Sequence, residues 1–195
     1  MKKLKLDGVI TMPFITIFMI FFGLTAHALE DVDPTLDEIT NFRQYSPSFS
    51  SAGQPTVAQF QRLKASGFER IIYIAFTNSG KNAIPEEDII VKSLGMEYLQ
   101  IPVDFQTPLP SEFYVFADAL RRFPDKVTLL HCQVNARASV FSFLYRVIYG
   151  GVSMAIAKDD LNTVWRPNEQ WRNFVFTVLK ENDLSPDCEG CQWNL

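Results

Sequence analysis

Apolar and polar positions along residues 41–180 follow two alternating patterns, one typical of strands and one typical of helices. Short runs rich in β-branched and aromatic residues predict strands, whereas apolar residues three or four positions apart predict helices. Strands are predicted within residues 41–54 and over residues 69–76, 96–103 and 126–131. Helices are predicted over residues 56–66, 85–94, 111–123, 138–149, 153–164 and 168–180. Strands that alternate with helices favour the α/β class, with a mostly parallel central sheet and helices on both faces.

The N-terminal 28 residues differ from the rest of the chain. Three lysines precede residues 8–26, which carry no charge, and Ala26-His27-Ala28 fits a cleavage site made of small residues. We therefore predict a signal peptide over residues 1–28 and a periplasmic or secreted protein. The alternative is an uncleaved membrane anchor, because the uncharged run approaches the length of a membrane span. After cleavage we expect no stable membrane association.

The remaining chain divides into three parts. Residues 29–40 are acidic and are expected to form a flexible lead-in, residues 41–182 a single α/β domain, and residues 183–195 a C-terminal tail. The tail contains Cys188 and Cys191, separated by two residues. In an oxidising compartment this pair most simply forms a disulfide, with a redox-active or metal-binding pair as the alternative. A disulfide would leave Cys132 as the free thiol.

Charge and histidine content exclude several classes of function. The whole chain has a net charge of −4, and loss of residues 1–28, with three lysines and one aspartate, would leave −6. An acidic domain without a basic run is a poor candidate for nucleic-acid binding. His131 is the only histidine after residue 28, which argues against a histidine-based metal site and a Ser/His/Asp triad. We expect neither a metal nor another cofactor.

The candidate chemistry concentrates in residues 127–139. An apolar run ends at His131 and is followed by Cys132, four further residues, Arg137 and a predicted helix. Backbone N–H groups in such a loop, with the positive end of the helix dipole behind them, favour an anion and the thiolate form of cysteine. Arg137 can bind two oxygen atoms of a phosphate at once. These features predict a nucleophile in an anion-binding loop, although a buried structural cysteine is the alternative. The other loop residues are His131, Gln133, Val134, Asn135, Ala136 and Ser139.

Three residues around this loop allow two interpretations each. Asp104 follows a predicted strand and could protonate a leaving group, or it could bind its own backbone in a turn. His131 could fill the core, or it could orient backbone groups and stabilise the thiolate. Ser139 could donate a hydrogen bond to the sulfur, or it could be an ordinary serine of a first helical turn.

The segment resembles the phosphate-binding loop of cysteine-dependent protein tyrosine and dual-specificity phosphatases, in which His-Cys, a short loop and Arg precede a helix. The resemblance covers about residues 41–180 and includes Ser51-Ala-Gly-Gln-Pro55, Ile101-Pro-Val-Asp104 and Trp165-Arg-Pro-Asn168. It is nearest to the bacterial branch similar to the beta-lactamase-hydrolase-like proteins.

The resemblance implies a tyrosine-phosphatase-like fold over residues 41–182 and hydrolysis of phosphate monoesters. The implied substrates are phosphorylated small molecules or phosphoproteins. It implies that Cys132 forms a phosphocysteine, that Arg137 binds the phosphoryl oxygens and that Asp104 is the general acid, with no cofactor.

Three features depart from the phosphatase pattern. Four residues rather than five separate Cys132 from Arg137, and Ala138 stands where the pattern has Ser or Thr. The loop also lacks glycine, although Asn135 could adopt a left-handed conformation at modest cost. These departures leave two other functions open. One is a non-catalytic protein that binds phosphate or another anion, and the other is a rhodanese-like sulfurtransferase with a Cys132 persulfide.

Overall fold

The computed structural model describes residues 34–78, 80–189 and 191–193. The predicted signal peptide and the first part of the lead-in therefore lie outside the described residues. The strands are β1 (Arg43–Ser46), β2 (Phe49–Ala52), β3 (Arg70–Tyr73), β4 (Glu97–Gln100) and β5 (Thr128–His131). They form one sheet in the order β1-β2-β5-β3-β4, in which β1 pairs antiparallel with β2 and the other pairs are parallel. The predicted mostly parallel sheet is confirmed.

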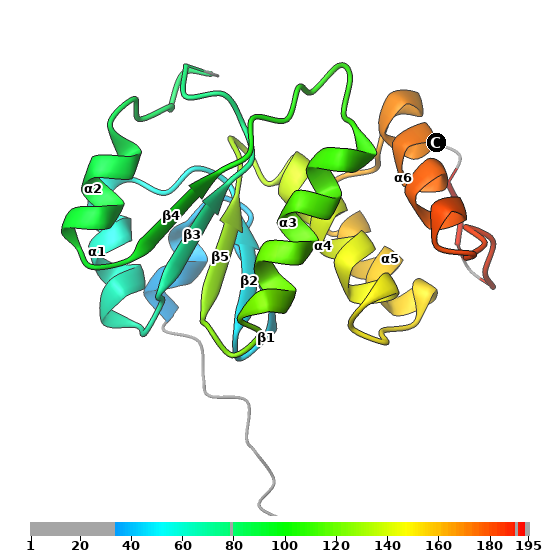
Figure 1. Cartoon of the computed structure of the whole chain (residues 1–195), viewed down its shortest axis with the longest axis horizontal. Coiled ribbons are helices and arrows are strands. Elements are labelled where there is room, and N and C mark those ends of the chain that lie inside the picture. Colours follow the sequence, from blue (N-terminus) through cyan, green and yellow to red (C-terminus); the bar gives the residue numbers. More distant parts are fainter. Residues whose placement is uncertain (1–33, 79, 190, 194–195) are drawn as a thin grey trace, which may run out of the picture.

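Helices cover both faces of this sheet (Figure 1). They are α1 (Val57–Ala65), α2 (Glu87–Ser93), α3 (Pro110–Arg122), α4 (Ala136–Ile148), α5 (Met154–Asn162) and α6 (Glu169–Glu181), with a short 3-10 helix η1 (Pro34–Glu38) before β1. One buried cluster joins η1, α1 and α2 to one face of the sheet. A second buried cluster joins α3, α4, α5 and α6 to the other face. Adjacent strand residues such as Leu129 and Leu130 belong to different clusters, because successive side chains of a strand point to opposite faces.

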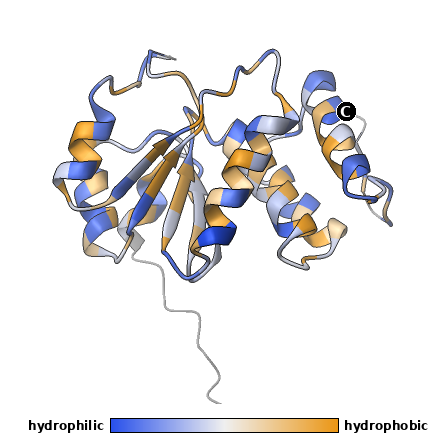
Figure 2. Ribbon diagram, viewed as in Figure 1, coloured by the Kyte–Doolittle hydropathy of each residue, from blue (hydrophilic) through white to orange (hydrophobic). Residues whose placement is uncertain are grey.

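Apolar residues gather in the strands and on the inner sides of the helices (Figure 2). Helix α3 illustrates the pattern: Phe113, Phe116, Ala117 and Leu120 are buried along one side. The helix begins at Pro110, whose fixed φ suits a first helical position, and Glu112 accepts a hydrogen bond from the backbone N–H of Leu109.

The start of the ordered domain differs from the prediction. Residues 34–40 were expected to belong to a flexible lead-in, but Leu36 and Ile39 are buried in the cluster with η1 and α1. Leu36 lies within η1, and Ile39 directly follows it. The prediction was wrong for this part because two apolar residues in an acidic segment suffice to fasten it to the core.

The segment 41–54 holds a hairpin of two strands, where a single short strand was expected. The C-terminal tail packs back onto the domain, since the ring of Trp193 lies 5.7 Å from that of Phe143 and 5.3 Å from that of Phe176. The Cα atoms of Cys188 and Cys191 are 5.1 Å apart and their sulfur atoms lie within bonding distance. This geometry is compatible with a disulfide, whose formation in the protein stays a prediction.

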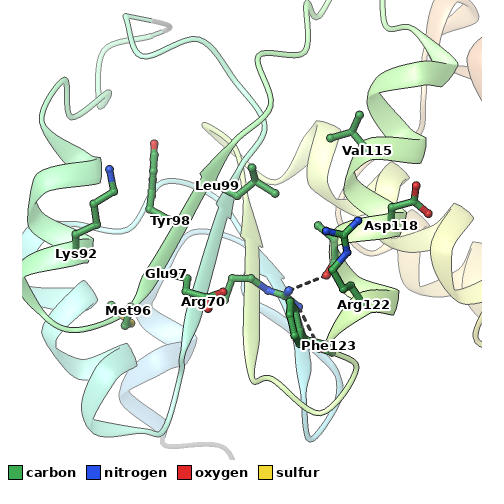
Figure 3. A pocket seen from close by; sticks show the side chains of 11 residues that line it. Arg70, Lys92, Met96, Glu97, Tyr98, Leu99, Val115, Asp118, Arg122 and Phe123 are labelled. Atoms are coloured by element: carbon green, nitrogen blue, oxygen red, sulfur yellow. Dashed lines mark hydrogen bonds between the residues drawn. The ribbon is translucent and has the colours of Figure 1, made fainter.

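A cavity of about 740 Å³ lies between the edge strand β4 and helix α3 (Figure 3). Leu99, Val115 and Phe123 contribute apolar side chains to its wall, and Arg70 contributes its guanidinium group. Arg70 and Glu97 are the first residues of their strands. The cavity therefore lies toward the amino ends of the parallel strands, away from the carboxyl ends at which α/β proteins usually bind ligands.

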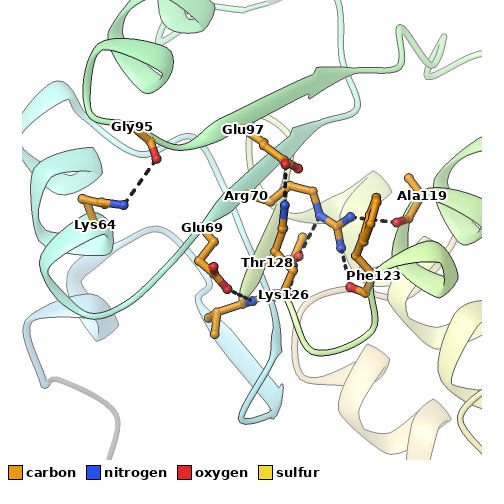
Figure 4. A network of polar contacts seen from close by, with 10 residues as sticks. Lys64, Glu69, Arg70, Gly95, Glu97, Ala119, Phe123, Lys126 and Thr128 are labelled. Carbon is orange, nitrogen blue, oxygen red and sulfur yellow. Dashed lines mark hydrogen bonds and ion pairs between the residues drawn. The ribbon is translucent and has the colours of Figure 1, made fainter.

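The guanidinium group of Arg70 is committed to the protein (Figure 4). Its Nε donates to Thr128 Oγ1 at 2.9 Å, and its two terminal nitrogens donate to the carbonyl oxygens of Ala119 at 2.7 Å and Phe123 at 3.4 Å. These bonds attach the end of α3 to β3 and β5. Arg70 is thus a structural cation that uses three N–H donors within the protein.

In the described part of the chain, no helix is both long and apolar enough to cross a membrane.

Candidate active site

Cys132 lies at the carboxyl end of β5, between the parallel neighbours β2 and β3. Register places His131, the last residue of β5, beside Ala52 of β2 and Tyr73 of β3. The backbone N–H of Cys132 then donates to the carbonyl oxygen of Ala52 at 3.3 Å. Cys132 is a free thiol and its side chain is fully buried. The nucleophile candidate therefore occupies the position in the sheet where a reactive loop is expected.

The loop closes through a left-handed residue. Asn135 has φ 69° and ψ 3°, and helix α4 begins at the next residue, Ala136. Asn135 thus adopts the left-handed conformation that the sequence left open to it, and it turns the chain without a glycine. Because the turn is complete at Asn135, α4 starts two residues earlier than predicted. Arg137 consequently lies in the first helical turn, close to the positive end of the helix dipole.

Contacts from two other segments hold the loop from outside. The side-chain amide of Asn41 donates to the carbonyl oxygen of Val134 at 3.0 Å, and that of Asn135 donates to the carbonyl oxygen of Asn41 at 2.7 Å. Gly53 forms a bridge with Val134. A Cβ atom at Gly53 would lie 2.9 Å from Thr40 Cβ and 3.0 Å from the carbonyl oxygen of Gln133. This close approach explains the glycine in the segment Ser51–Pro55, which braces the loop.

Arg137 is 7% exposed, and its Nε has no hydrogen-bond partner in the described structure. The centre of its guanidinium group lies 5.2 Å from the ring centre of Phe105, a cation–π contact. Phe105 directly follows Asp104, so this contact brings the Asp104 loop against the Cys132 loop. Buried donors without partners are rare in folded proteins. The free Nε therefore indicates a place for an acceptor.

The side chain of Phe105 packs against Trp165 and Trp171. Their rings lie 5.8 and 5.5 Å from that of Phe105, and Trp171 Nε1 donates to the carbonyl oxygen of Phe105 at 2.9 Å. Asn168 caps α6 by accepting from the backbone N–H of Trp171 at 3.1 Å. The segment Trp165–Asn168 thus supports the loop that carries Asp104.

Asp104 is exposed, and its Oδ1 accepts a hydrogen bond from the backbone N–H of Gln106 at 2.8 Å. This is the turn contact of the second interpretation given above, and it leaves the other carboxylate oxygen available. Among the described residues, no hydrogen bond joins Asp104 to Cys132 or Arg137. The structure therefore brings Cys132 and Arg137 into one loop and places Asp104 on a neighbouring loop.

The other loop residues have distinct environments. The Ser139 hydroxyl donates to the carbonyl oxygen of Ala136 at 3.0 Å, which is the behaviour of an ordinary serine in a first helical turn. Val134 is exposed at the tip of the loop, whereas Ala136 is buried. His131 is buried and its Nε2 lies 2.9 Å from Glu87 Oε1.

The sequence interpretation missed several residues of this site. Glu87 and Tyr73 lie beneath the loop, Asn41 braces it, and Phe105 contacts Arg137. Glu87 carried a detectable signal, because it stands four residues before the buried Val91, on the apolar side of its helix. A carboxyl group at such a position is almost always paired.

The pKa of Tyr73 is raised to about 12, mainly by burial and also by the nearby carboxylate of Glu87. The hydrogen bond with Gln133 acts in the opposite direction but is outweighed. Tyr73 is therefore a neutral phenol near neutral pH. It accepts a hydrogen bond from Gln133 Nε2 at 2.8 Å and donates one to the carbonyl oxygen of Phe76 at 3.0 Å.

A metal centre would need several ligating side chains in one place. Within the described ranges, no three His, Cys, Asp or Glu side chains come together in a way that could hold a metal ion.

Comparison with solved structures gives the class of protein. The chain is similar to kinase associated phosphatase, with a TM-score of 0.60 and 15% identity over 69% of this chain and 87% of that one. It is also similar to the core catalytic domain of the PP-IP phosphatase SIW14 from S. cerevisiae, with a TM-score of 0.55 and 14% identity over 73% of this chain and 93% of that one. These likenesses show the tyrosine and dual-specificity phosphatase fold.

A further solved structure gives the family. A DUF442 protein from Shewanella putrefaciens CN-32, described as a candidate phosphatase, has a TM-score of 0.68 and 32% identity to this chain, over 75% of this chain and 96% of that one. The chain belongs to this DUF442 family of phosphatase-like proteins. No family model and no curated protein matches the chain.

Proposed function

We propose that this protein hydrolyses phosphate monoesters through a phosphocysteine at Cys132. The observation that carries the proposal is the buried Arg137 Nε without a partner, in the first turn of α4 and five residues after a free thiol. A phosphoryl group in the loop would supply the missing acceptor and would meet the helix dipole with its negative charge.

In the first step, the Cys132 thiolate attacks phosphorus, a sulfur–phosphorus bond forms and the bond to the leaving oxygen breaks. Arg137 and the backbone N–H groups of the loop bind the phosphoryl oxygens, on which charge develops. Asp104, as a carboxylic acid, donates its proton to the leaving oxygen. In the second step, water attacks phosphorus, Asp104 accepts the proton of that water, and phosphate and the thiolate are released.

Access to Cys132 requires movement of its surroundings, because its side chain is fully buried in this structure. The loop is braced by Asn41, which precedes β1, and by Gly53, which follows β2, whereas Phe105 reaches Arg137 from the more exposed Asp104 loop. We infer that the Asp104 loop moves away to admit substrate and returns to bring Asp104 to the leaving group.

The substrate proposed for this site is a phosphorylated small molecule or a phosphoprotein. Support comes from solved relatives of the same fold, one of which is a kinase associated phosphatase with its catalytic site cysteine replaced by serine. A second is a PP-IP phosphatase. Both associate this fold with phosphate chemistry, and the first associates it with a cysteine.

We also propose that the domain acts outside the cytoplasm, after removal of residues 1–28. The support is the lysine-led uncharged run and the Ala26-His27-Ala28 site. N-terminal sequencing of the protein from a fractionated cell would begin at Leu29 and place it outside the cytoplasm. An intact N-terminus in the cytoplasmic fraction would contradict this proposal.

The test of function is hydrolysis of an aryl phosphate by the reduced protein, beside Cys132→Ser. The proposal requires turnover that Cys132→Ser abolishes. Turnover that survives Cys132→Ser would come from another group or a contaminant and would reject the proposal. Absence of turnover, combined with tight binding of an oxyanion such as tungstate, would favour the non-catalytic alternative. Sulfur transfer from thiosulfate to cyanide would favour the sulfurtransferase.

A further inference from the structure

We propose that Glu87 is a positioning residue that holds the Cys132 loop in its anion-binding shape through two arms of hydrogen bonds. One arm runs to His131, immediately before the nucleophile, and the other runs through Gln54 to Gln133, immediately after it. The inference rests on the proposed function of the loop, and it identifies a buried residue that holds the loop in position.

The burial of Glu87 requires an explanation. It is the first residue of α2 and is 1% exposed, whereas Glu86 before it is exposed and Asp88 after it pairs with Lys92 at the surface. Burying a carboxyl group is costly unless hydrogen bonds satisfy both of its oxygens. His131 and Gln54, which both lead to the loop, each contact one oxygen of Glu87, and Tyr98 of β4 also hydrogen-bonds to this carboxyl group.

The first arm fixes the ring before the nucleophile. Glu87 Oε1 lies 2.9 Å from His131 Nε2, and both side chains are buried. The His131 ring stacks on Tyr73, with ring centres 4.7 Å apart and an angle of 20° between the planes. Because β5 ends at His131, fixing this side chain fixes the point at which the loop leaves the sheet.

The second arm fixes the residue after the nucleophile. Glu87 Oε2 accepts from Gln54 Nε2 at 2.5 Å, and Gln54 Oε1 accepts from Gln133 Nε2 at 3.3 Å. Gln133 also donates to Tyr73, and its backbone carbonyl oxygen accepts from the backbone N–H of Gln54 at 3.1 Å. Gln133 is thus held by its side chain and by its backbone.

The donor and acceptor roles in this network depend on the carboxylate of Glu87. Glu87 Oε2 accepts from Gln54 Nε2, so the amide of Gln54 presents its nitrogen to Glu87 and its oxygen to Gln133. If an NH₂ group replaced the oxygen that faces Gln54, a donor would face a donor, and a reversed Gln54 amide would turn its nitrogen toward the nitrogen of Gln133. If the NH₂ group faced His131 instead, Nε2 of the ring would have to accept and the ring proton would move to the buried Nδ1, which has no hydrogen-bond partner in the described structure. Glu87→Gln therefore disturbs one arm or the other with almost no change in side-chain volume.

The experiment compares the full-length wild type with Glu87→Gln, Gln54→Leu and the control Asp88→Asn. Asp88 is next to Glu87 but its carboxylate is at the surface. Two quantities are measured on each folded variant: the Kd for tungstate, and kcat and KM for an aryl phosphate. Concentrations are corrected for the fraction of Cys132 that iodoacetamide can alkylate.

We expect Glu87→Gln to weaken tungstate binding at least about ten-fold, the effect of breaking a buried hydrogen bond to a charged group. Gln54→Leu removes one arm and leaves the Glu87–His131 contact, so its effect is smaller and in the same direction. It also serves as the test if Glu87→Gln fails to fold. Asp88→Asn leaves both quantities within about two-fold of wild type, as expected for a surface carboxylate.

The possible outcomes separate this inference from the proposed function. If Glu87→Gln and Gln54→Leu lower the melting temperature but leave the Kd and kcat/KM unchanged, Glu87 is only structural and the inference is wrong. If wild type binds tungstate without turnover and Glu87→Gln weakens binding, positioning stands and the phosphatase proposal falls. If wild type neither binds nor turns over, both fall.

Discussion

Two loops meet at the carboxyl ends of the strands, and they are held in different ways. Several segments hold the Cys132 loop. Asn41 and Gly53 contact Val134 of the loop, and Glu87 contacts His131 directly before Cys132. The Asp104 loop is exposed at Asp104, and Phe105 anchors it to Arg137 and Trp171. The first loop is held by contacts from several segments of the chain, while the second is held by Phe105 and by a hydrogen bond from Gln170 to Gln106.

The difference indicates a division of labour between the loops. A cradle for a phosphoryl group stabilises a transition state only if its donors are already in place, so rigidity is useful there. A general acid over a buried nucleophile must leave and return, so fewer contacts are useful there. The following predictions test whether the two loops differ in this way, beginning with the largest expected effect.

Arg137→Lys should reduce kcat/KM about 10²–10³-fold, the effect of losing a preorganised donor to the developing charge. Lysine keeps the charge but cannot bind two oxygens in the plane of a guanidinium group. The measurement is steady-state hydrolysis of an aryl phosphate, with the exposed Arg122→Lys as the control. A loss below about ten-fold would mean that charge alone, and not the rigid fork, is what the cradle supplies.

Asp104→Asn should reduce kcat about 10²-fold for an alkyl phosphate, because proton donation to the leaving group is lost. The loss should be smaller for an aryl phosphate, whose phenolate leaves more easily without a proton. Rates for the two substrates are compared in Asp104→Asn and in Asp118→Asn, a control on the surface of α3. Equal losses for both substrates would exclude Asp104 as the acid.

Asn135→Ala should lower the free energy of unfolding by about 1–2 kcal/mol, because alanine pays the cost of the left-handed conformation. The substitution also removes the hydrogen bond to the carbonyl oxygen of Asn41. Asn135→Gly is the matched variant, since glycine adopts this conformation freely and loses only the side-chain contact. Urea unfolding should rank wild type, Gly and Ala in that order. An alanine variant as stable as the glycine variant would show that φ at this position is not a constraint.

Phe105→Leu should raise the rate at which iodoacetamide alkylates Cys132, because the cation–π contact that holds the Asp104 loop against Arg137 is lost. Such a contact contributes about 0.5–2 kcal/mol, so the change should be roughly thirty-fold or less. The melting temperature should change little. Unchanged alkylation would mean that the Asp104 loop does not control access to the thiol.

Tyr73→Phe should alter the stability of the region beneath the Cys132 loop at alkaline pH. The folded pKa of Tyr73, about 12, exceeds the ordinary value of 10.0, so its neutral form is favoured in the folded protein. This contribution is fully present below about pH 10 and is lost as pH rises toward 12. Urea unfolding of Tyr73→Phe should therefore show a shallower decline in stability above about pH 10 than wild type. If stability declined equally steeply in Tyr73→Phe and wild type, other tyrosines would be the cause of the lost stability.

The sequence was sufficient for β3, β4 and β5, for the six α-helices and for the Cys132 loop, because local patterns determine them. Val127–Leu130 is mostly apolar and is followed by His131 and Cys132, and Asn135 was the residue in the loop best able to adopt positive φ. Each of these inferences used residues close together in the chain.

The missed features depend on residues far apart in the chain. Leu36 and Ile39 looked like part of an acidic lead-in, and their burial becomes visible only when α1 lies beside them. Glu87 reaches His131 across 44 positions and Gln54 across 33. A local sequence pattern cannot identify the distant partner of a buried carboxyl group. The position of Glu87 on the apolar side of its helix indicates only that a partner exists.

The most direct test of the account is to look for the phosphocysteine. The reduced protein is mixed with an aryl phosphate and quenched rapidly, and its peptides are analysed by mass spectrometry, beside Cys132→Ser and Asp104→Asn. We expect one phosphoryl group on the peptide that contains Cys132, none in Cys132→Ser, and a larger fraction in Asp104→Asn, because its second step lacks a base. Hydrolysis without a phosphorylated Cys132 peptide in any sample, or with the phosphoryl group on another residue, would contradict the account.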